Sequence, residues 1–265
     1  MKREVSCVLF LLSGFLFPFC AGHAQCAGSG YPGLLIPQIA DGGAWMTTIV
    51  VTNMASTQAS PSLVFFQDVG RGATQPWSLG FSEMSSAQAQ TLTIPPGSTL
   101  FLHTLGSAPA TAVGWGMLSG GGQCGNGAVS VYAVFTQRVP GRPDQDGTGE
   151  ATIPAHRFLV PFDNTNGAVT SMAIASAGSL QTISLGVRTS DGTVTQLPAI
   201  ALPPDGHTSF AFPTQFPNTS GKAGLAEFYS SSDTFSILAL RFGADAFTST
   251  PVYSVTGAPS IVSTP

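Results

Sequence analysis

The sequence predicts an all-β protein built from two tandem antiparallel Ig-like β-sandwiches that arose by internal duplication. Short runs of β-branched and aromatic residues recur roughly every 8–12 residues, separated by Gly, Pro, Asn and Ser, which is typical of a sandwich. The order of these runs in the first half of the chain is repeated in the second half. No window shows a sustained 3.6-residue period with capping residues, so we expect helix to be a minor component.

The first 24 residues are typical of a signal peptide. Two positive residues, Lys2 and Arg3, precede an apolar run over 5–19, and the small residues Gly22 and Ala24 suit cleavage after Ala24. The apolar run, roughly 15 residues long, falls short of the ~20 that a membrane-spanning helix needs. We therefore expect an exported protein, extracellular, at the cell surface or in a periplasm, with no membrane span after cleavage.

The duplication is clearest where each half begins. The stretch LLIPQIADGGAWMTTIVVTN at 34–53 is echoed by RFLVPFDNTNGAVTSMAIAS at 157–176. Both have an apolar segment that includes a proline, then a Gly-containing turn, then a run of β-branched and small residues. The predicted organisation is a signal peptide over 1–24, a Gly-rich leader over 25–33, a first β-sandwich module over 34–140, a polar linker over 141–156 and a second module over 157–265.

The expected strands follow the chain in the same order in both modules. In the first module they cover residues 45–52, 62–67, 90–94, 98–103, 112–118 and 129–136. In the second module, residues 168–175, 182–188 and 235–240 correspond to the first, second and last of these. The paired prolines Pro95-Pro96 and Pro203-Pro204 mark equivalent corners, because a proline lacks the N–H that a central strand requires.

The composition argues against several classes of partner. Charged residues make up 8% of the chain, and after removal of the signal peptide seven positive and twelve negative residues remain. A surface that binds nucleic acid needs several cations on one face, so we do not expect this acidic chain to bind nucleic acid. Apolar residues still amount to 43% of the chain, which is enough for a sizeable core.

Two cysteines remain in the mature chain, Cys26 and Cys124, because Cys7 and Cys20 lie in the signal peptide. An even pair in an exported protein favours a disulfide. Neither cysteine lies in a CxxC motif, so a reactive thiol or a metal ligand is the less favoured alternative. We predict a Cys26–Cys124 disulfide that ties the leader to the Gly-rich loop at 120–127.

The duplication also bears on the three tryptophans. Each aligns with an apolar residue of the second module: Trp45 with Val169, Trp77 with Leu197 and Trp115 with Leu225. A row of exposed tryptophans would indicate a sugar-stacking platform, but apolar counterparts favour core packing. We therefore expect the tryptophans to pack inside the modules, each of which closes its own apolar core.

No catalytic constellation is evident. The motifs G-x-S-x-G, S-x-x-K and H-E-x-x-H are absent, and His103, His156 and His207 have no recognisable nucleophile. Glycoside cleavage would need two acids that face each other. Most candidate acids lie in turn-like surroundings, which favours a turn-supporting role: Asp41, Asp68, Glu83, Asp163, Asp191, Asp205, Glu227 and Asp233. We predict no catalytic residue and no cofactor.

One stretch of the linker resembles a cation-binding loop. Asp144, Asp146 and Glu150 alternate around a glycine and offer the oxygen ligands that Ca²⁺ prefers. The string lacks a third acid before the glycine, and Glu150 comes too early for the closing position of an EF-hand. A solvated linker is the favoured interpretation, and calcium that stiffens the joint between the modules is the alternative.

Several strings resemble uncharacterised secreted bacterial proteins with tandem Ig-like β-sandwich modules. In the first module the string is IPQIADGGAWMTT, and in the second they are RFLVPFDNTNG, LPPDGHTSF and ALRFGADAFTSTPV. The resemblance covers nearly the whole mature chain. It implies the tandem architecture and export, and it carries no activity and no site.

These observations predict a non-catalytic secreted or cell-surface module pair with a structural or binding role, whose partner is an extracellular protein or glycan met through loops. The alternative is a secreted hydrolase that uses isolated carboxylates, with Asp163 and Glu227 as the acids to test. A third hypothesis, a strand-donating chaperone, needs a basic cleft between the modules. Only four residues could supply it: Arg157, Arg188, Lys222 and Arg241.

Overall fold

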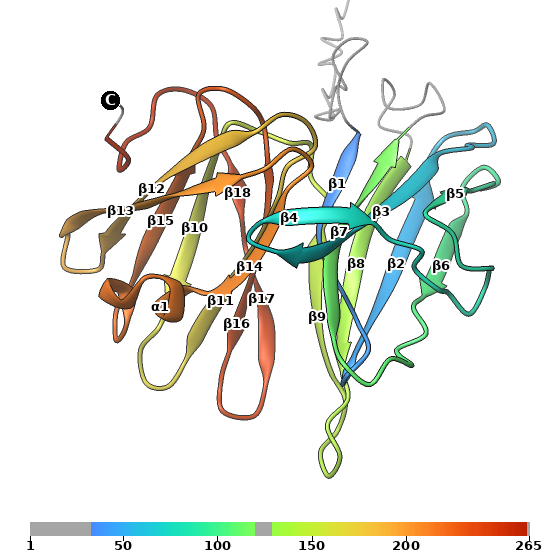
Figure 1. The fold of residues 1–265 in the computed structure, drawn as a ribbon, viewed down its shortest axis with the longest axis horizontal. Helices are drawn as coiled ribbons and strands as arrows, with labels where there is room; N and C mark the ends of the chain where they lie inside the picture. Colours follow the sequence, from blue (N-terminus) through green and yellow to red (C-terminus); the bar gives the residue numbers. More distant parts are fainter. Residues whose placement is uncertain (1–32, 120–128, 264–265) are drawn as a thin grey trace, which may run out of the picture.

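The protein is all-β, as the sequence predicts. The computed structural model describes residues 33–119 and 129–263. All the strand pairs in this part of the chain are antiparallel, and the helical structure there is one turn of α-helix, α1 (Phe212–Gln215), and a 3-10 turn over Pro217–Thr219. Figure 1 shows two halves side by side, with the first half of the sequence in blue to green and the second in yellow to red.

The first half forms a β-sandwich of two sheets. Sheet 1A has the order β1-β7-β3-β4, with β5 also paired to β3, and sheet 1B has the order β6-β2-β8-β9. The strands of sheet 1A are β1 (Leu34–Asp41), β3 (Ser62–Gly70), β4 (Ala73–Pro76), β5 (Ala89–Thr91) and β7 (Ala112–Ser119). The strands of sheet 1B are β2 (Trp45–Asn53), β6 (Thr99–His103), β8 (Val129–Gln137) and β9 (Gln145–Glu150).

The second half has the same plan. Sheet 2A has the order β13-β12-β15-β10-β18, and sheet 2B has the order β14-β11-β16-β17. The strands of sheet 2A are β10 (Arg157–Asp163), β12 (Gln181–Thr189), β13 (Val194–Leu202), β15 (Ala223–Tyr229) and β18 (Tyr253–Ser254). The strands of sheet 2B are β11 (Val169–Ala175), β14 (His207–Ala211), β16 (Ser236–Phe242) and β17 (Phe247–Thr250). Apart from β5 and β18, each strand has a counterpart at the same place in the other half.

The stretch expected to be a polar linker contains a strand. Within 141–156, β9 pairs with β8 along its whole length, from Tyr132 opposite Glu150 to Gln137 opposite Gln145. Its buried positions are Gly147 and Gly149, which supply no apolar side chain for a sequence pattern to detect. The segment that connects the two halves therefore contributes the edge strand β9 to sheet 1B.

The two halves do not have fully separate interiors. The core of the second half is drawn from that half alone, but the core of the first half includes Ala173, Leu238, Leu240 and Phe247 of the second. Leu238 and Phe247 lie against the glycines of β9, where a side chain on β9 would collide with them. The expectation that each module closes its own core is therefore wrong for the first half, because sheet 2B covers one of its sides.

The junction also explains Trp115. Trp45 and Trp77 are partly buried and pack against the first core, as expected of core residues. Trp115 is fully buried, but it lies on the outer face of sheet 1A, stacked on Phe66 at a ring-centroid distance of 4.5 Å, and it clusters with Ala175 of the second half. The expectation that it packs inside its own module is wrong, because the second half covers the face on which it lies.

Polar contacts reinforce this junction. The Asp205 carbonyl accepts from Trp115 Nε1 at 3.1 Å and from Thr74 Oγ1 at 2.7 Å, and the His207 N–H donates to the Gly72 carbonyl at 3.0 Å. The β3–β4 hairpin of the first half thus lies against the β13–β14 turn of the second (Figure 1).

Among the residues that the structure describes, no helix is long and apolar enough to cross a membrane.

Candidate functional site

Asp163, one acid of the hydrolase alternative, lies at the end of β10 in a local network. Its carboxylate accepts from Thr165 Oγ1 at 2.6 Å and from Arg241 Nη2 at 2.7 Å. The hydrogen bonds from Thr165 and the neighbouring Arg241 guanidinium lower the pKa of Asp163 to about 2. At neutral pH this group is an ionised, paired carboxylate that fixes the turn after β10.

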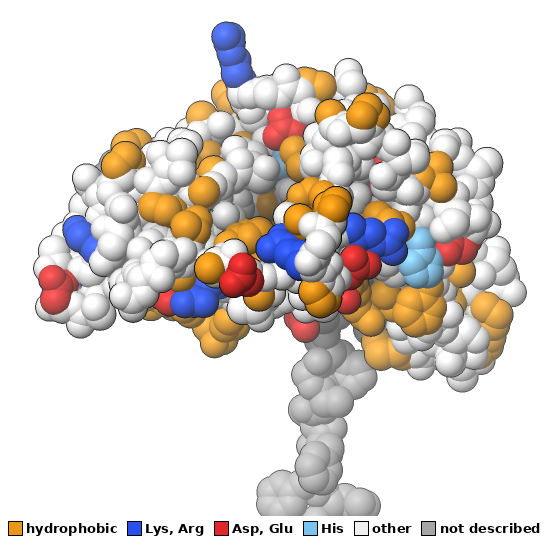
Figure 2. All heavy atoms as spheres, turned by 90° about the horizontal axis from the view of Figure 1, so that it is seen from below, with side chains coloured by type: hydrophobic (Ala, Val, Ile, Leu, Met, Phe, Trp, Pro, Cys, Tyr) orange, Lys and Arg blue, Asp and Glu red, His pale blue; other side chains and the backbone are white. Residues whose placement is uncertain are grey.

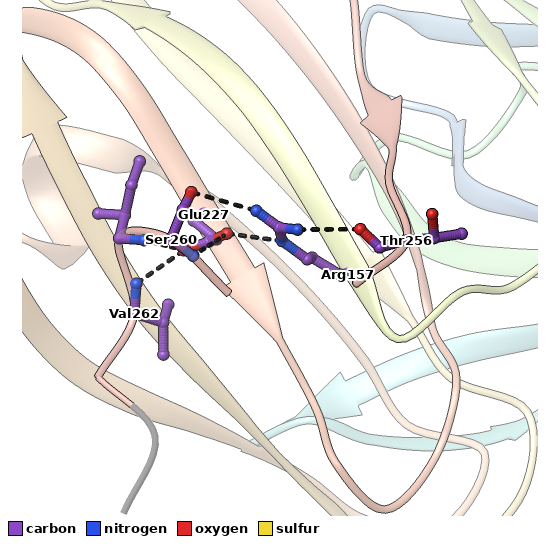
Figure 3. Close-up of polar contacts among 6 residues, drawn as sticks. Arg157, Glu227, Thr256, Ser260 and Val262 are labelled. Atoms are coloured by element: carbon purple, nitrogen blue, oxygen red, sulfur yellow. Dashed lines mark hydrogen bonds and ion pairs between the residues drawn. The ribbon is translucent and has the colours of Figure 1, made fainter. Parts of the chain in front are cut away.

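Glu227, the other acid of that alternative, is completely buried on β15 (Figure 3). Its carboxylate accepts from Arg157 Nε at 2.7 Å. It also accepts the backbone N–H groups of Ser260 at 3.0 Å, of Ile261, and of Val262 at 2.7 Å. These donors belong to residues 255–263, which we call the C-terminal strap, and the carboxylate holds that strap against the outer face of sheet 2A.

Arg157 extends the same network. Its Nη1 donates to the Thr256 carbonyl and its Nη2 to Ser260 Oγ, each at 3.1 Å. Burial raises the pKa of Glu227, but the three strap N–H groups and Arg157 outweigh that effect and hold the pKa below its usual value. The Arg157–Glu227 pair is thus a structural clamp that fixes the C-terminal strap.

The two acids are too far apart for glycoside cleavage. Asp163 pairs with Ala223, and Glu227 pairs with Leu159 on the same two strands. The positions differ by four residues, or about 13 Å along a strand. Retaining and inverting glycosidases place their carboxyl groups roughly 5–9.5 Å apart. These two carboxylates therefore do not form the acid pair that the hydrolase alternative needs.

Most of the remaining candidate acids support turns. Thr189 Oγ1 and the Thr193 N–H donate to Asp191, and these bonds lower its pKa to about 2. Three others accept backbone N–H groups in loops: Asp41 from Gly106, Asp205 from Gly178 and Asp233 from Thr234. This is the role that their turn-like surroundings predict.

The three calcium candidates do not converge. Asp144 pairs with Arg138 at 3.1 Å, and Asp146 accepts from Thr136 Oγ1 at 2.6 Å. Glu150 lies four residues farther along β9, about 13 Å from Asp146 along the strand. In the part of the chain that the structure describes, no group of three potential ligands gathers. The arrangement gives the calcium alternative no support.

Two further sequence predictions concern a disulfide and a basic cleft. Cys26 and Cys124 lie outside the described residues, so their disulfide stays a prediction. The basic cleft of the chaperone hypothesis loses two of its four cations, because Arg157 is held by Glu227 and Arg241 by Asp163.

The outer face of sheet 1B carries a feature that the sequence analysis missed. Phe101 on β6 and Tyr132 on β8 both lie directly opposite Val50 on β2, so the three side chains form one cross-strand row. Val50 is buried between them, while Phe101 is 49% exposed and Tyr132 36% exposed. With strands about 4.8 Å apart, the two aromatic residues are about 10 Å apart. We call this row and its neighbours the aromatic face.

Hydroxyl groups, one charged pair and a further carboxylate surround the row. The neighbouring residues of the aromatic face are Thr48, Thr52, Thr99, His103, Ser130, Val134 and Glu150, which lies directly opposite Tyr132. The ring of His103 contacts the Glu83 carboxylate, which also accepts the His103 N–H at 2.8 Å. Burial raises the pKa of Glu83, and these two hydrogen bonds lower it more. None of the residues of the aromatic face is Lys or Arg.

On the face that Figure 2 shows, charged side chains of both signs lie near one another in the middle of the view, and hydrophobic and uncharged polar side chains cover most of the rest. No known protein family matches the sequence, and no curated protein is similar to it.

Proposed function

We propose that the chain is an exported, non-catalytic binding protein of two tandem Ig-like modules, and that its partner is a neutral extracellular glycan that binds the aromatic face. The predicted signal peptide over 1–24 supports export. The resemblance to secreted bacterial tandem-module proteins supports both export and the Ig-like assignment. The common strand plan of sheets 1A and 2A and of sheets 1B and 2B supports an origin by duplication.

The Phe101–Val50–Tyr132 row, with its two exposed aromatic side chains, is the observation that carries this proposal. Ring faces provide a flat apolar surface for the C–H faces of a sugar, and the Thr and Ser hydroxyls around them exchange hydrogen bonds with sugar hydroxyls. The charged groups beside the row are Glu150, which lies directly opposite Tyr132 on β9, and the contacting pair His103 and Glu83. A face without Lys or Arg favours a neutral glycan over an acidic one.

The carboxylate geometry supports a non-catalytic role. Asp163 is bound to Arg241, and Glu227 is enclosed by the C-terminal strap and Arg157. Changing either acid to alanine is expected to alter stability only. Turnover of a glycan or ester substrate that disappears with Asp163→Ala or Glu227→Ala would favour the hydrolase alternative instead.

The glycan proposal is tested with a panel of immobilised neutral and acidic glycans. The double variant Phe101→Ala/Tyr132→Ala is expected to lose binding to neutral glycans by at least tenfold. The matched control is Leu180→Ala/Tyr253→Ala, which removes two exposed apolar side chains elsewhere and should bind as the wild type does. Equal binding by both double variants, or binding only to acidic glycans, would refute the proposal. A purified protein partner whose binding depends on the same two residues would replace the glycan by a protein.

A further inference from the structure

A second feature lies between the two halves. A cleft of about 300 Å³ separates part of the first sandwich from sheet 2B. Its lining is mainly apolar and includes the aromatic residues Trp45, Phe135, Phe210 and Phe242. In Figure 2 the surface is hollowed between the halves, and hydrophobic side chains lie in the hollow. Apolar clefts of this size at module junctions are common sites for small molecules.

The hollow exists because four neighbouring positions of sheet 2B are small. Ser171 pairs with Ala211 and Ala173 pairs with Ser209 across β11 and β14, and all four line the cleft. On the neighbouring strand β16, the larger side chains of Leu238 and Leu240 also line the cleft and pack against the core of the first half. Protein interiors normally fill such space with side chains, so a block of small residues at this one place leaves room for another molecule.

Polar groups are concentrated at one end. The Gln38 side chain lines the cleft, and its Oε1 is 2.9 Å from Nε2 of His207. The fully buried His207 ring also contacts Asp68 Oδ2 through Nδ1 at 3.1 Å. The ring thus contacts oxygen atoms of both Asp68 and Gln38, and the Gln38 side chain is held against it. Burial raises the pKa of Asp68, while hydrogen bonds from His207 and the Gly70 N–H lower it more, which keeps the carboxylate ionised.

Three side chains at the cleft have hydrogen-bonding groups left for a ligand. Gln38 uses its oxygen on His207, and among the described residues no acceptor receives a hydrogen bond from its amide nitrogen. Ser171 and Ser209 likewise make no side-chain hydrogen bond in that part of the chain. Hydrogen-bonding capacity is thus present at the edge of an otherwise apolar space, which matches a molecule that is mostly apolar with one polar end.

We propose that this cleft binds a compact, uncharged, mainly apolar molecule, such as a one- or two-ring compound with a single carbonyl oxygen, and that the oxygen accepts a hydrogen bond from Gln38. The molecule contacts both halves at once. Its binding therefore stabilises the junction and raises the melting temperature as its concentration rises. This site is separate from the aromatic face, which lies on the outer surface of sheet 1B.

The test uses acetophenone and ethylbenzene, which differ mainly in the carbonyl oxygen, with glucose as a polar probe. Binding to the full mature chain is followed by ligand-observed NMR and by the shift in Tm. Acetophenone is expected to bind more tightly than ethylbenzene by roughly 3–10-fold, the value of one neutral hydrogen bond. Glucose is expected not to bind the cleft.

Two variants separate the parts of the proposal. Ser209→Leu fills the cleft from an exposed position and should weaken acetophenone binding at least tenfold, while Thr182→Leu, an exposed position on sheet 2A, should leave it unchanged. Gln38→Leu should make the two aromatic probes bind equally. The proposal is overturned if neither aromatic probe binds, if Ser209→Leu binds them as the wild type does, or if the wild type does not distinguish them. Glycan binding that survives in Ser209→Leu would show that the aromatic face works independently.

Discussion

Replacing Glu227 with glutamine is expected to release the C-terminal strap and to destabilise the second half. The buried carboxylate accepts from Arg157 and from three successive N–H groups of the strap. Glutamine leaves Arg157 without its counter-charge and directs an N–H₂ group toward backbone donors. Breaking a buried ion pair in this way costs about 3–5 kcal/mol, which for a protein of this size lowers Tm by on the order of 10 °C.

The assay combines Tm with hydrogen exchange at the amides of Ser260, Ile261 and Val262. These amides should be protected in the wild type and should exchange faster in Glu227→Gln. The matched control is Glu150→Gln, which changes an exposed glutamate on β9 and should alter Tm by less than about 1 °C. Strap amides that exchange equally slowly in wild type and Glu227→Gln, together with an unchanged Tm, would refute the clamp.

The same carboxylate gives the strap a pH dependence. The pKa of Glu227 is lowered in the folded protein, so its contribution to stability is complete above the unfolded pKa of about 4.3. That contribution is lost as the pH falls through the lower folded pKa. Strap protection in the wild type should therefore decline below about pH 4, while Glu227→Gln should show no such decline.

Three further changes test the junction and the linker. Trp115→Ala removes a fully buried ring stacked on Phe66 and should lower the free energy of unfolding by about 3–5 kcal/mol, measured by denaturant unfolding. A loss of less than about 1 kcal/mol would contradict the burial of this ring at the junction. Gly147→Ala places a Cβ 2.5 Å from the Phe247 ring and should lower Tm by several degrees. In the control Gly243→Ala, the nearest atom to the new Cβ is 3.5 Å away, so this variant should be tolerated. Equal effects of the two variants would show that β9 does not pack closely on β17. Excess chelator should leave Tm unchanged, because the linker acids do not converge, and a clear fall would restore the calcium interpretation.

The sequence was a good guide where side chains alternate. The nine strand ranges that the sequence predicts agree with nine of the eighteen described strands to within a few residues, because their apolar positions are bounded by Gly, Pro and Ser. The strand β9 could not be predicted in this way, since Gly147 and Gly149 occupy its buried positions and the apolar atoms come from Leu238 and Phe247 on the other half. A pattern within one segment cannot report packing that another segment supplies.

The comparison of the two halves failed for Trp115 for a related reason. The apolar counterpart Leu225 predicts a core position for Trp115, but both residues lie on the outer faces of their sheets. That face is buried at Trp115 because the second half covers it. The aromatic face escaped notice because Phe101 lies between Leu100 and Leu102, so β6 shows no alternation of polar and apolar residues.

The strap has a consequence for how such modules can be stacked. The outer face of sheet 1A presents Trp115 and Met117 on β7, and it accommodates the following sandwich. On the matching strand β15 of sheet 2A, Leu225 and Glu227 stand in the equivalent places, and Glu227 secures the chain's own backbone across the sheet. A surface so occupied cannot receive another sandwich in the manner of the first.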